Sequence, residues 1–366
     1  MIRATFVMEQ HVGHHTYYQN LRAHVAEDPR IRATWVPVTY SAERSWLNSL
    51  PVSQQLRGSL IGRSQALRGL RGEPADVFFF FTQVPAMLVA QTLGKVPYVL
   101  STDITPLQYD AMAAHYGHRT DYGFAVTAYK QHLNRRVFQK AAQVLPWTHW
   151  VRQSLVEDYG VSESRVRVIP IGVDLARWKP AKPRNGGAGP VRMLFVGGDF
   201  KRKGGELLLQ VFRNLPAGSA SLDIVTQSPV EPEPGVRVHR GVKANSEELV
   251  ALFGQSHLFV LPTKADAFGI VAAEAMASGL PVVMSDIGGA RDIVEDGVTG
   301  YLVPAGGERT LQERLSALVF DRELRERVGA AARSRAEQFF DGRQNSKRVV
   351  DALLDAARAD PSAAVR

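Results

Sequence analysis

The sequence of 366 residues contains no cysteine. This absence excludes disulfide bonds, thiolate metal ligands and cysteine nucleophiles. Long apolar runs are also missing: the most apolar stretch, residues 77–94, is interrupted by Gln83 and Pro85, whereas a membrane-spanning helix needs about 18 apolar residues in succession. Residues 1–10 lack the apolar core of a secretory signal and have the pattern of a strand. We therefore expect a cytoplasmic protein.

The overall composition is that of a globular protein, with 45% hydrophobic and 22% charged residues. The chain length suggests roughly two to three domains. The formal net charge is +8, which allows anionic partners such as nucleic acid, acidic lipid or phosphorylated small molecules. Because no recognised nucleic-acid motif accompanies this charge, a nucleic-acid binder ranks last among the hypotheses.

Short β-branched or aromatic runs alternate with longer helical patterns along the chain. The expected strands are residues 2–8, 32–38, 76–81, 97–102, 143–147, 166–171, 191–198, 221–226, 236–241, 257–263 and 281–286. Helical patterns include residues 247–256 and 310–339. This alternation favours an α/β protein whose parallel sheets are covered by helices on both faces.

The clearest domain boundary is a Pro- and Gly-rich stretch at residues 178–190, which has no apolar periodicity. We predict a first domain over residues 1–170, a hinge or linker over 171–190 and a second domain over 191–342. Ligands of such proteins bind at the carboxyl ends of the strands or in the gap between domains.

A basic loop follows the first strand of the second domain, in the stretch FVGGDFKRKGGELLL. Lys201, Arg202 and Lys203 lie between two Gly-Gly pairs, the second of which leads into a helix. Backbone N–H groups at a helix start attract anions, and nearby cations reinforce the attraction. The loop matches neither GxGxxG nor GxxxxGK[ST], which disfavours a standard dinucleotide fingerprint or P-loop. The alternative is a surface turn with solvated basic side chains.

An acidic pair lies in the stretch DAFGIVAAEAMASGLPVV, with Asp266 before a helix and Glu274 one turn inside it. The Phe268–Gly269 turn allows close backbone approach, so the free N–H groups at the helix start can hold a diphosphate. Carboxylates on either side would accept hydrogen bonds from hydroxyl groups, a layout that fits a nucleotide-sugar. The alternative is that Asp266 caps the helix and Glu274 is an exposed helix former.

Residues 266–306 resemble the donor-site signature of GT4-type retaining glycosyltransferases, the glycosyl transferases group 1 of GT-B fold. The shared features are the acidic pair, a helix and strand rich in Ala, Gly and Pro, a Gly-Gly turn, an acidic residue at Asp292 and the phrase DGVTGYLV. Residues 169–178 are similar to the interdomain hinge of that family, and the basic loop to its phosphate-binding loop. The resemblance covers about residues 165–345, essentially the second domain.

The resemblance implies a GT-B fold, in which two Rossmann-like domains with doubly wound parallel sheets face a cleft. It also implies that the C-terminal helix, residues 343–366, crosses back to the first domain. The residues implied in catalysis are Asp266, Lys203 and Arg202, and those implied in donor binding are Glu274, Phe268, Gly269, Ile270, Val271, Gly198 and Gly13. No metal and no cofactor are implied, because the nucleotide-diphospho-sugar is itself a substrate.

Each implied role is specific. Asp266 would contact the donor sugar near the reacting carbon, Glu274 would accept the ribose hydroxyls, and the N–H groups of residues 269–271 would hold the diphosphate. Lys203, with Arg202 beside it, would neutralise the leaving diphosphate. The sequence departs from the family pattern at two positions. Asp266 replaces the usual Glu, and Gly198 stands where an Arg is frequent, so Arg202 is expected to substitute for that Arg.

In the first domain, Gly13 lies at a strand-to-helix turn where the family has a loop that faces donor and acceptor. His11, His14 and His15 are close by, but no complete metal-ligand set is visible. We expect His14 and Asp103 on the acceptor side, although His14 as an uninvolved turn residue and Asp103 as a turn-forming residue stay open. Many relatives have a histidine near the position of Asp103, and this sequence has none adjacent to it.

The leading hypothesis is therefore a metal-independent retaining glycosyltransferase that acts on a glycan, lipid-linked or small-molecule acceptor. The alternatives are a nucleotide-sugar epimerase and a non-catalytic nucleotide-sugar binder or partner of another transferase. An arginine-rich, partly amphipathic segment at residues 41–74 either rests on anionic lipid at the inner membrane face or is a solvated helix packed on its own domain. The nucleobase, the sugar and the acceptor carry no signature in the sequence.

Overall fold

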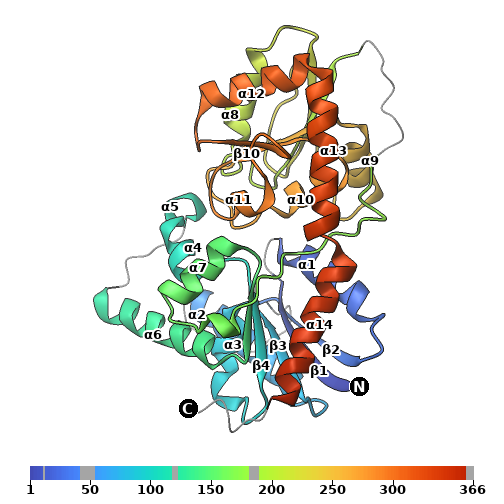
Figure 1. Cartoon of the computed structure of the whole chain (residues 1–366). Coiled ribbons are helices and arrows are strands. Elements are labelled where there is room, and N and C mark those ends of the chain that lie inside the picture. Colours follow the sequence, from blue (N-terminus) through green and yellow to red (C-terminus); the bar gives the residue numbers. More distant parts are fainter. Residues whose placement is uncertain (11–12, 42–53, 118–122, 181–188, 360–366) are drawn as a thin grey trace. The chain divides into compact units, whose positions relative to one another are not determined.

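The computed structural model describes residues 1–10, 13–41, 54–117, 123–180 and 189–359 (Figure 1). The chain folds into two compact units. Unit 1 comprises Met1–Asp110, Arg119–Gly172 and Gly342–Arg366, and unit 2 comprises Ala111–His118 and Val173–Asp341. Each unit contains its own parallel sheet, so the predicted doubly wound α/β architecture is confirmed.

Unit 1 has a five-stranded sheet in the order β2-β1-β3-β4-β5. Its strands are β1 (Ile2–Glu9), β2 (Ile31–Val38), β3 (Val77–Phe81), β4 (Tyr98–Thr102) and β5 (Gln143–Pro146). The helices in this part of the chain are α1 (His14–Val25), α2 (Gln54–Leu70), α3 (Gln83–Val89), α4 (Pro106–Ala111), α6 (Phe124–Lys140), α7 (His149–Glu157) and α14 (Gly342–Arg358), with 3₁₀ turns η2 (Ala90–Thr92) and η3 (Glu163–Arg165).

The phenylalanine run of β3 shows why both faces of this sheet are covered. Side chains alternate along a strand, so neighbouring residues point to opposite faces. Phe78 and Phe80 belong to a core shared with α2, α3 and α6. Phe81 instead packs on Tyr17 of α1 and stacks on Trp147. On that second face, α14 lies against α1 and the central strands (Figure 1). A strand buried on both faces has no need of polar alternation.

Unit 2 has a six-stranded sheet in the order β11-β10-β9-β6-β7-β8. Its strands are β6 (Val191–Val196), β7 (Ala220–Val225), β8 (Val236–His239), β9 (Leu258–Leu261), β10 (Val282–Ser285) and β11 (Gly300–Val303). Its helices are α5 (Ala113–Tyr116), α8 (Gly205–Arg213), α9 (Glu247–Gln255), α10 (Ile270–Ala277), α11 (Ala290–Ile293), α12 (Glu308–Phe320) and α13 (Arg322–Phe339).

Each sheet has a switch point, where the strand order reverses and the loops leave to opposite sides. In unit 1 it lies between β1 and β3, and in unit 2 between β6 and β9. Ligands of doubly wound sheets bind outside the carboxyl ends of the strands at such points. The topology therefore directs attention to the loops after these four strands.

Three expectations about individual elements are corrected. Residues 166–171 form no regular strand; Val166 makes an isolated bridge with Val144, and the N–H groups of Arg167 and Ile169 donate to the carbonyls of Val144 and Pro146. The pattern over 310–339 contains two helices rather than one, because Asp321 ends α12 and caps α13. Strand β11 was not among the expected strands.

Candidate functional site

The switch point of unit 2 brings together the two loops that the sequence singled out. The basic loop follows β6 and the Asp266 loop follows β9, and these strands are neighbours. The backbone N–H of Lys264 donates to the carbonyl of Arg202 at 2.8 Å. Gly204 has a positive φ of 79°, and a Cβ there would overlap the carbonyl oxygen of Pro262. Only glycine allows the two loops to approach this closely.

Lys203 and Asp266 meet at this point. The Nζ of Lys203 donates to Oδ2 of Asp266 at 2.5 Å, and both side chains are about 15% exposed, at 15% and 14%. The stem of Lys203 passes Gly197, where a Cβ would lie 3.0 Å from it. The structure thus joins the predicted cation and the predicted sugar-side carboxylate in one partly buried pair.

Arg202 has a different role from its neighbour. Its Nη1 donates to the carbonyl of Ala265 at 2.8 Å, and its backbone N–H and Nε donate to the carboxylate of Asp199 at 3.0 and 3.3 Å. The guanidinium therefore holds the two loops together. The prediction that it neutralises a leaving diphosphate remains a prediction, and the observed contacts favour a positioning role.

The start of α10 is arranged as an anion-binding end. Gly269 is the N-cap residue with φ of 79°, and no side chain caps the helix. The first N–H groups of a helix have no partner within it, and among the described residues those of Ile270 and Val271 make no backbone hydrogen bond. The alternative that Asp266 caps this helix is wrong, because its carboxylate pairs with Lys203 instead.

The side chain of Phe268 packs inward rather than toward a ligand. It is buried and meets the ring of Phe340 edge-on at a centroid distance of 6.0 Å. The predicted donor contact of Phe268 is thus limited to its backbone, and its ring anchors the turn before α10.

Glu274 is buried, so the alternative of an exposed helix former is wrong. Burial raises the pKa of Glu274 to about 8. Burial is the only cause of this pKa shift, so within the described part of the chain no charge or hydrogen bond to its carboxyl group contributes to it. A buried carboxyl group without a partner is costly, and ligand hydroxyl groups could supply the missing hydrogen bonds.

Two hydroxyl side chains after β7 complete this end of the sheet. The carbonyl of Gly198 accepts hydrogen bonds from Thr226 Oγ1 and Ser228 Oγ, both at 3.3 Å, and Ser228 Oγ accepts from the Phe200 N–H at 3.1 Å. Sequence reasoning missed both residues. The available signal was the polar stretch TQS directly after a buried strand.

The switch point of unit 1 carries a second polar cluster. His14, the first residue of α1 after Gly13, places Nε2 at 3.4 Å from Oδ2 of Asp103 and Nδ1 at 3.8 Å from Oε2 of Glu9. Burial opposes protonation of this ring, but the Asp103 and Glu9 carboxylates outweigh it and raise the pKa of His14. The structure therefore joins the two predicted acceptor-side residues, and the histidine near Asp103 comes from α1.

Glu9 is a member of this cluster that the sequence reasoning missed. It is the last residue of β1, and it accepts a hydrogen bond of 2.6 Å from Thr82 Oγ1, directly after β3. Among the described residues, Nδ1 of His14 and Oδ1 of Asp103 are buried without a hydrogen-bond partner. Asp103 therefore makes no turn-forming bond, and the cluster has unused capacity for hydrogen bonds.

Several sequence predictions have other outcomes. His11 and residues 42–53 of the arginine-rich segment lie outside the described residues. The apolar side chains of α2, such as Ile61 and Ala66, are buried in unit 1, which favours the packed-helix alternative for this segment. Within the described ranges, no group of three or more His, Asp or Glu side chains is suited to a metal ion, and no helix is long and apolar enough to cross a membrane.

Comparison with solved structures identifies the fold class. Over 97% of this chain, the structure resembles sucrose-phosphate synthase from Thermosynechococcus elongatus, with a TM-score of 0.77 and 15% identity over 99% of that chain. It also resembles Anabaena Alr3699/HepE in complex with UDP-glucose, with a TM-score of 0.71 and 17% identity over 97% of this chain and 100% of that one. The chain has the GT-B fold.

The two halves of the chain match known families. Residues 22–177 match Glycosyltransferase Family 4 and residues 179–335 match Glycosyl transferases group 1. Both matches are to glycosyltransferase families, and together they cover most of the chain. A D-inositol 3-phosphate glycosyltransferase from Nocardia farcinica is 30% identical over 229 residues, which are 56% of this chain and 51% of that protein. A sulfoquinovosyl transferase from Arabidopsis thaliana is 30% identical over 202 residues, 53% of this chain and 37% of that protein. The chain thus spans about half the length of the first relative and less than half of the second.

Proposed function

We propose that this protein transfers a sugar from a nucleotide-diphospho-sugar to an acceptor hydroxyl group, with retention of the anomeric configuration and without a metal ion. The observation that carries the proposal is the Lys203–Asp266 pair beside the uncapped start of α10, with the unpartnered carboxyl group of Glu274 buried in the same helix. These groups offer cation, N–H donors and carboxylates in the order that a diphosphate flanked by two polyols requires.

In the proposed reaction, the bond between the anomeric carbon and the diphosphate oxygen breaks as the acceptor oxygen bonds to the same carbon. The acceptor attacks from the face that the leaving group departs from, and the diphosphate oxygen takes the acceptor proton. Lys203 and the N–H groups of Ile270 and Val271 stabilise the charge that grows on the diphosphate. Asp266 accepts a hydrogen bond from the donor sugar, and Glu274 accepts from the ribose.

Unit 1 is proposed to hold the acceptor. The unused hydrogen-bonding atoms of His14 and Asp103 suit a hydroxyl group, which both donates and accepts. We also propose that the protein works at an anionic membrane surface. The arginines of residues 41–74 support that location by their charge, whereas the apolar side chains of α2 are already occupied by the core of unit 1.

The test begins with a thermal-shift panel of UDP- and GDP-sugars in the presence of EDTA, because a bound donor raises the melting temperature by mass action. The donor that binds is then incubated with and without candidate acceptors, and the anomeric configuration of the product is read by NMR. Retention with EDTA present is expected. A product of inverted configuration, or loss of turnover with EDTA, contradicts the corresponding part of the proposal.

Two further outcomes separate the alternatives. A new nucleotide-sugar formed without acceptor would identify an epimerase. Donor binding without turnover on any acceptor would identify a non-catalytic binder. UDP-glucose is a sensible first donor, because a protein of the same fold has been solved in complex with it.

A further inference from the structure

Helix α6 of unit 1 exposes large apolar side chains at its N-terminal end. Phe124 is 91% exposed, Tyr129 63% and Val126 46%. Other large apolar side chains that are exposed in the described part of the chain, such as Phe320 of α12, are far from these three in sequence. Figure 1 shows the N-terminal end of α6 directed away from the sheet of unit 1. Single exposed apolar residues are ordinary, but three within six positions indicate an interaction surface.

The charge of α6 is of one sign. Its sequence, FAVTAYKQHLNRRVFQK, contains four Lys or Arg residues and no Asp or Glu. Arg135 donates to the backbone carbonyl of Asp158 at 2.9 Å. Arg136 and Lys140 are exposed, and within the described ranges no ion pair or side-chain hydrogen bond engages them. These two cations are therefore available to an anionic partner.

Tyr129 and two of the cationic residues share one side of the helix. Arg136 and Lys140 follow Tyr129 by seven and eleven positions, spacings that return to nearly the same side of an α-helix. Phe124 precedes Tyr129 by five positions, about 140° around the helix, and is on the same side as Arg135, eleven positions on. The opposite side of α6, including Val137 and Phe138, is buried in the core of unit 1. One outward side thus combines the ring of Tyr129 with two cations, and the ring of Phe124 is exposed at the start of the same helix.

We propose that the exposed surface of α6, formed by Tyr129, Arg136 and Lys140 with Phe124 at the helix start, docks the protein on an anionic lipid surface. Aromatic rings settle at the level of the headgroups, and Lys and Arg are attracted by the negative charge of the leaflet. A second copy of the chain fits less well, because pairing through α6 would bring like charges together. The proposal names the contact surface for the membrane location proposed above, and it does not depend on the glycosyl-transfer chemistry.

The test is flotation of the full chain with vesicles of phosphatidylcholine, with and without phosphatidylglycerol, at low and high salt. The wild type is expected to float with the anionic vesicles and to bind them more weakly at high salt, since exposed charges are screened. The double variant Arg136→Gln/Lys140→Gln is expected to bind roughly 30-fold more weakly, from about 1 kcal/mol per cation near the surface. Phe124→Ser/Tyr129→Ser is expected to lose about tenfold or more at both salt concentrations.

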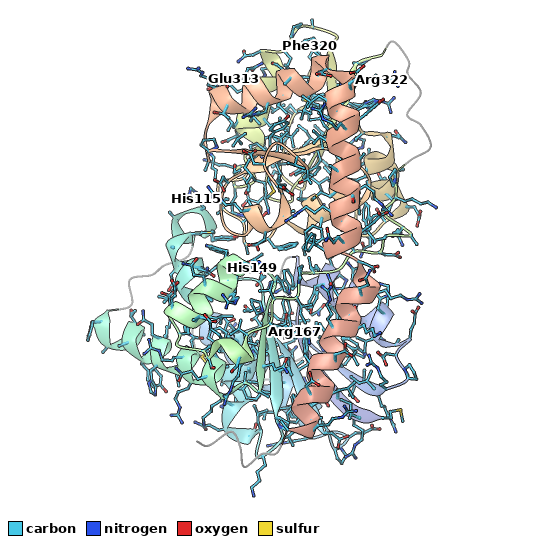
Figure 2. All side chains as sticks on the ribbon, in the orientation of Figure 1. His115, His149, Arg167, Glu313, Phe320 and Arg322 are labelled. Atoms are coloured by element: carbon cyan, nitrogen blue, oxygen red, sulfur yellow. The ribbon has the colours of Figure 1, made fainter. Side chains whose placement is uncertain are left out.

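Matched controls come from unit 2. Lys243→Gln/Arg327→Gln removes two exposed cations, and Phe320→Ser removes an exposed aromatic ring at the end of α12 (Figure 2). Both controls are expected to float like the wild type. Circular dichroism and melting temperature check that every variant is folded.

Three results would overturn the proposal. The first is a wild type that does not distinguish vesicles with phosphatidylglycerol from those without it. The second is unchanged flotation of both α6 double variants, which would move the contact elsewhere. The third is a dimer in sedimentation that the Phe124→Ser/Tyr129→Ser variant dissociates, which would make α6 a protein interface. Failure to turn over any nucleotide-sugar affects only the proposed function, because flotation requires no donor.

Discussion

Lys203 and Asp266 are 63 positions apart in the sequence, yet their Nζ and Oδ2 atoms lie 2.5 Å apart. Neighbouring strands β6 and β9 end side by side, and Gly204 lets the loop after one strand lie against the loop after the other. Each member of the pair is the partner that the other needs at low solvent exposure. In the proposed reaction, Lys203 turns to the leaving diphosphate and Asp266 to the sugar.

Neutralising either member of the pair is expected to slow glycosyl transfer strongly. Asp266→Asn and Lys203→Met should each lower kcat by about 10²–10³, the usual cost of removing one electrostatic contact to the developing charge. The measurement is steady-state turnover of the donor found by thermal shift. Arg213→Met is the matched control, because it breaks the exposed Arg213–Glu233 pair in the same unit. Turnover near the wild-type rate in either site variant would remove that residue from the proposed chemistry.

Asp266→Glu tests the reach of the sugar-side carboxylate. The family that the sequence resembles usually has Glu at this position, and the extra methylene would carry the carboxylate farther from the backbone of the loop. We expect the ratio of kcat/KM values between two donor sugars to change, while the affinity for the free nucleoside diphosphate stays the same. Equal ratios in variant and wild type would show that residue 266 does not select the sugar.

Glu274 gives a pH-dependence with a definite sign. Its pKa rises from 4.5 in the unfolded chain to about 8 in the fold because of burial. Between these values the folded state binds more protons than the unfolded state, so stability falls as pH rises from about 4.5 to about 8. Glu274→Gln keeps the shape of the neutral side chain and is expected to remove this loss, of roughly 5 kcal/mol over the full window. Urea unfolding at several pH values measures it.

The same residue should link donor affinity to pH. Ribose hydroxyl groups favour the ionised carboxylate. As the pH is raised toward 8, the affinity of the wild type for the nucleotide should therefore increase, by up to about tenfold per pH unit. Calorimetric titration with the nucleoside diphosphate measures the slope, which Glu274→Gln should abolish. Glu323→Gln, an exposed position on α13, serves as the control. An unchanged slope in Glu274→Gln would separate this carboxyl group from the ligand.

The parts of the site that the sequence predicted are those written in short contiguous stretches. The basic loop and the stretch around Asp266 can be recognised locally, because glycines and charged residues directly follow a buried strand in each. The burial of Glu274 also had a signal, because α10 is composed almost entirely of small apolar residues, and a helix that is apolar all round is buried. This composition already argued against an exposed Glu274.

Contacts that depend on strand order could not be predicted in this way. Glu9 and Thr82 form a hydrogen bond because β1 and β3 are neighbours, although β2 lies between them in the sequence. No local pattern reports which strands pair. Strand β11 was missed for a related reason: its four residues are too few for a clear period, and pairing with β10 defines it.

His14 offers a second test by pH, in which neighbouring charges rather than burial raise the pKa. Its folded pKa is raised by the Asp103 and Glu9 carboxylates despite burial. A raised pKa contributes stability that is fully present below the unfolded value and is lost as pH rises through the folded value. His14→Gln should therefore cost more stability at pH 5.5 than at pH 9, a pair of conditions on the two sides of the usual histidine pKa of about 6.5. In an NMR titration, Asp103→Asn should move the midpoint of His14 downward, and an unmoved midpoint would contradict the assigned pairing.

Gly204 tests whether the close approach of the two loops is required. Alanine at this position meets two obstacles: a φ of 79°, which costs roughly 1–3 kcal/mol for a residue with a Cβ, and overlap with the carbonyl of Pro262. Gly218 has nearly the same φ, 80°, and no atom within 4 Å of its Cβ position. Gly218→Ala therefore measures the backbone term alone. We expect Gly204→Ala to lower the urea midpoint well beyond Gly218→Ala and to reduce donor turnover, because the loops that bring Lys203 to Asp266 must separate. If the two variants unfold at the same midpoint and turn over donor equally, the approach of the loops is not what positions the pair.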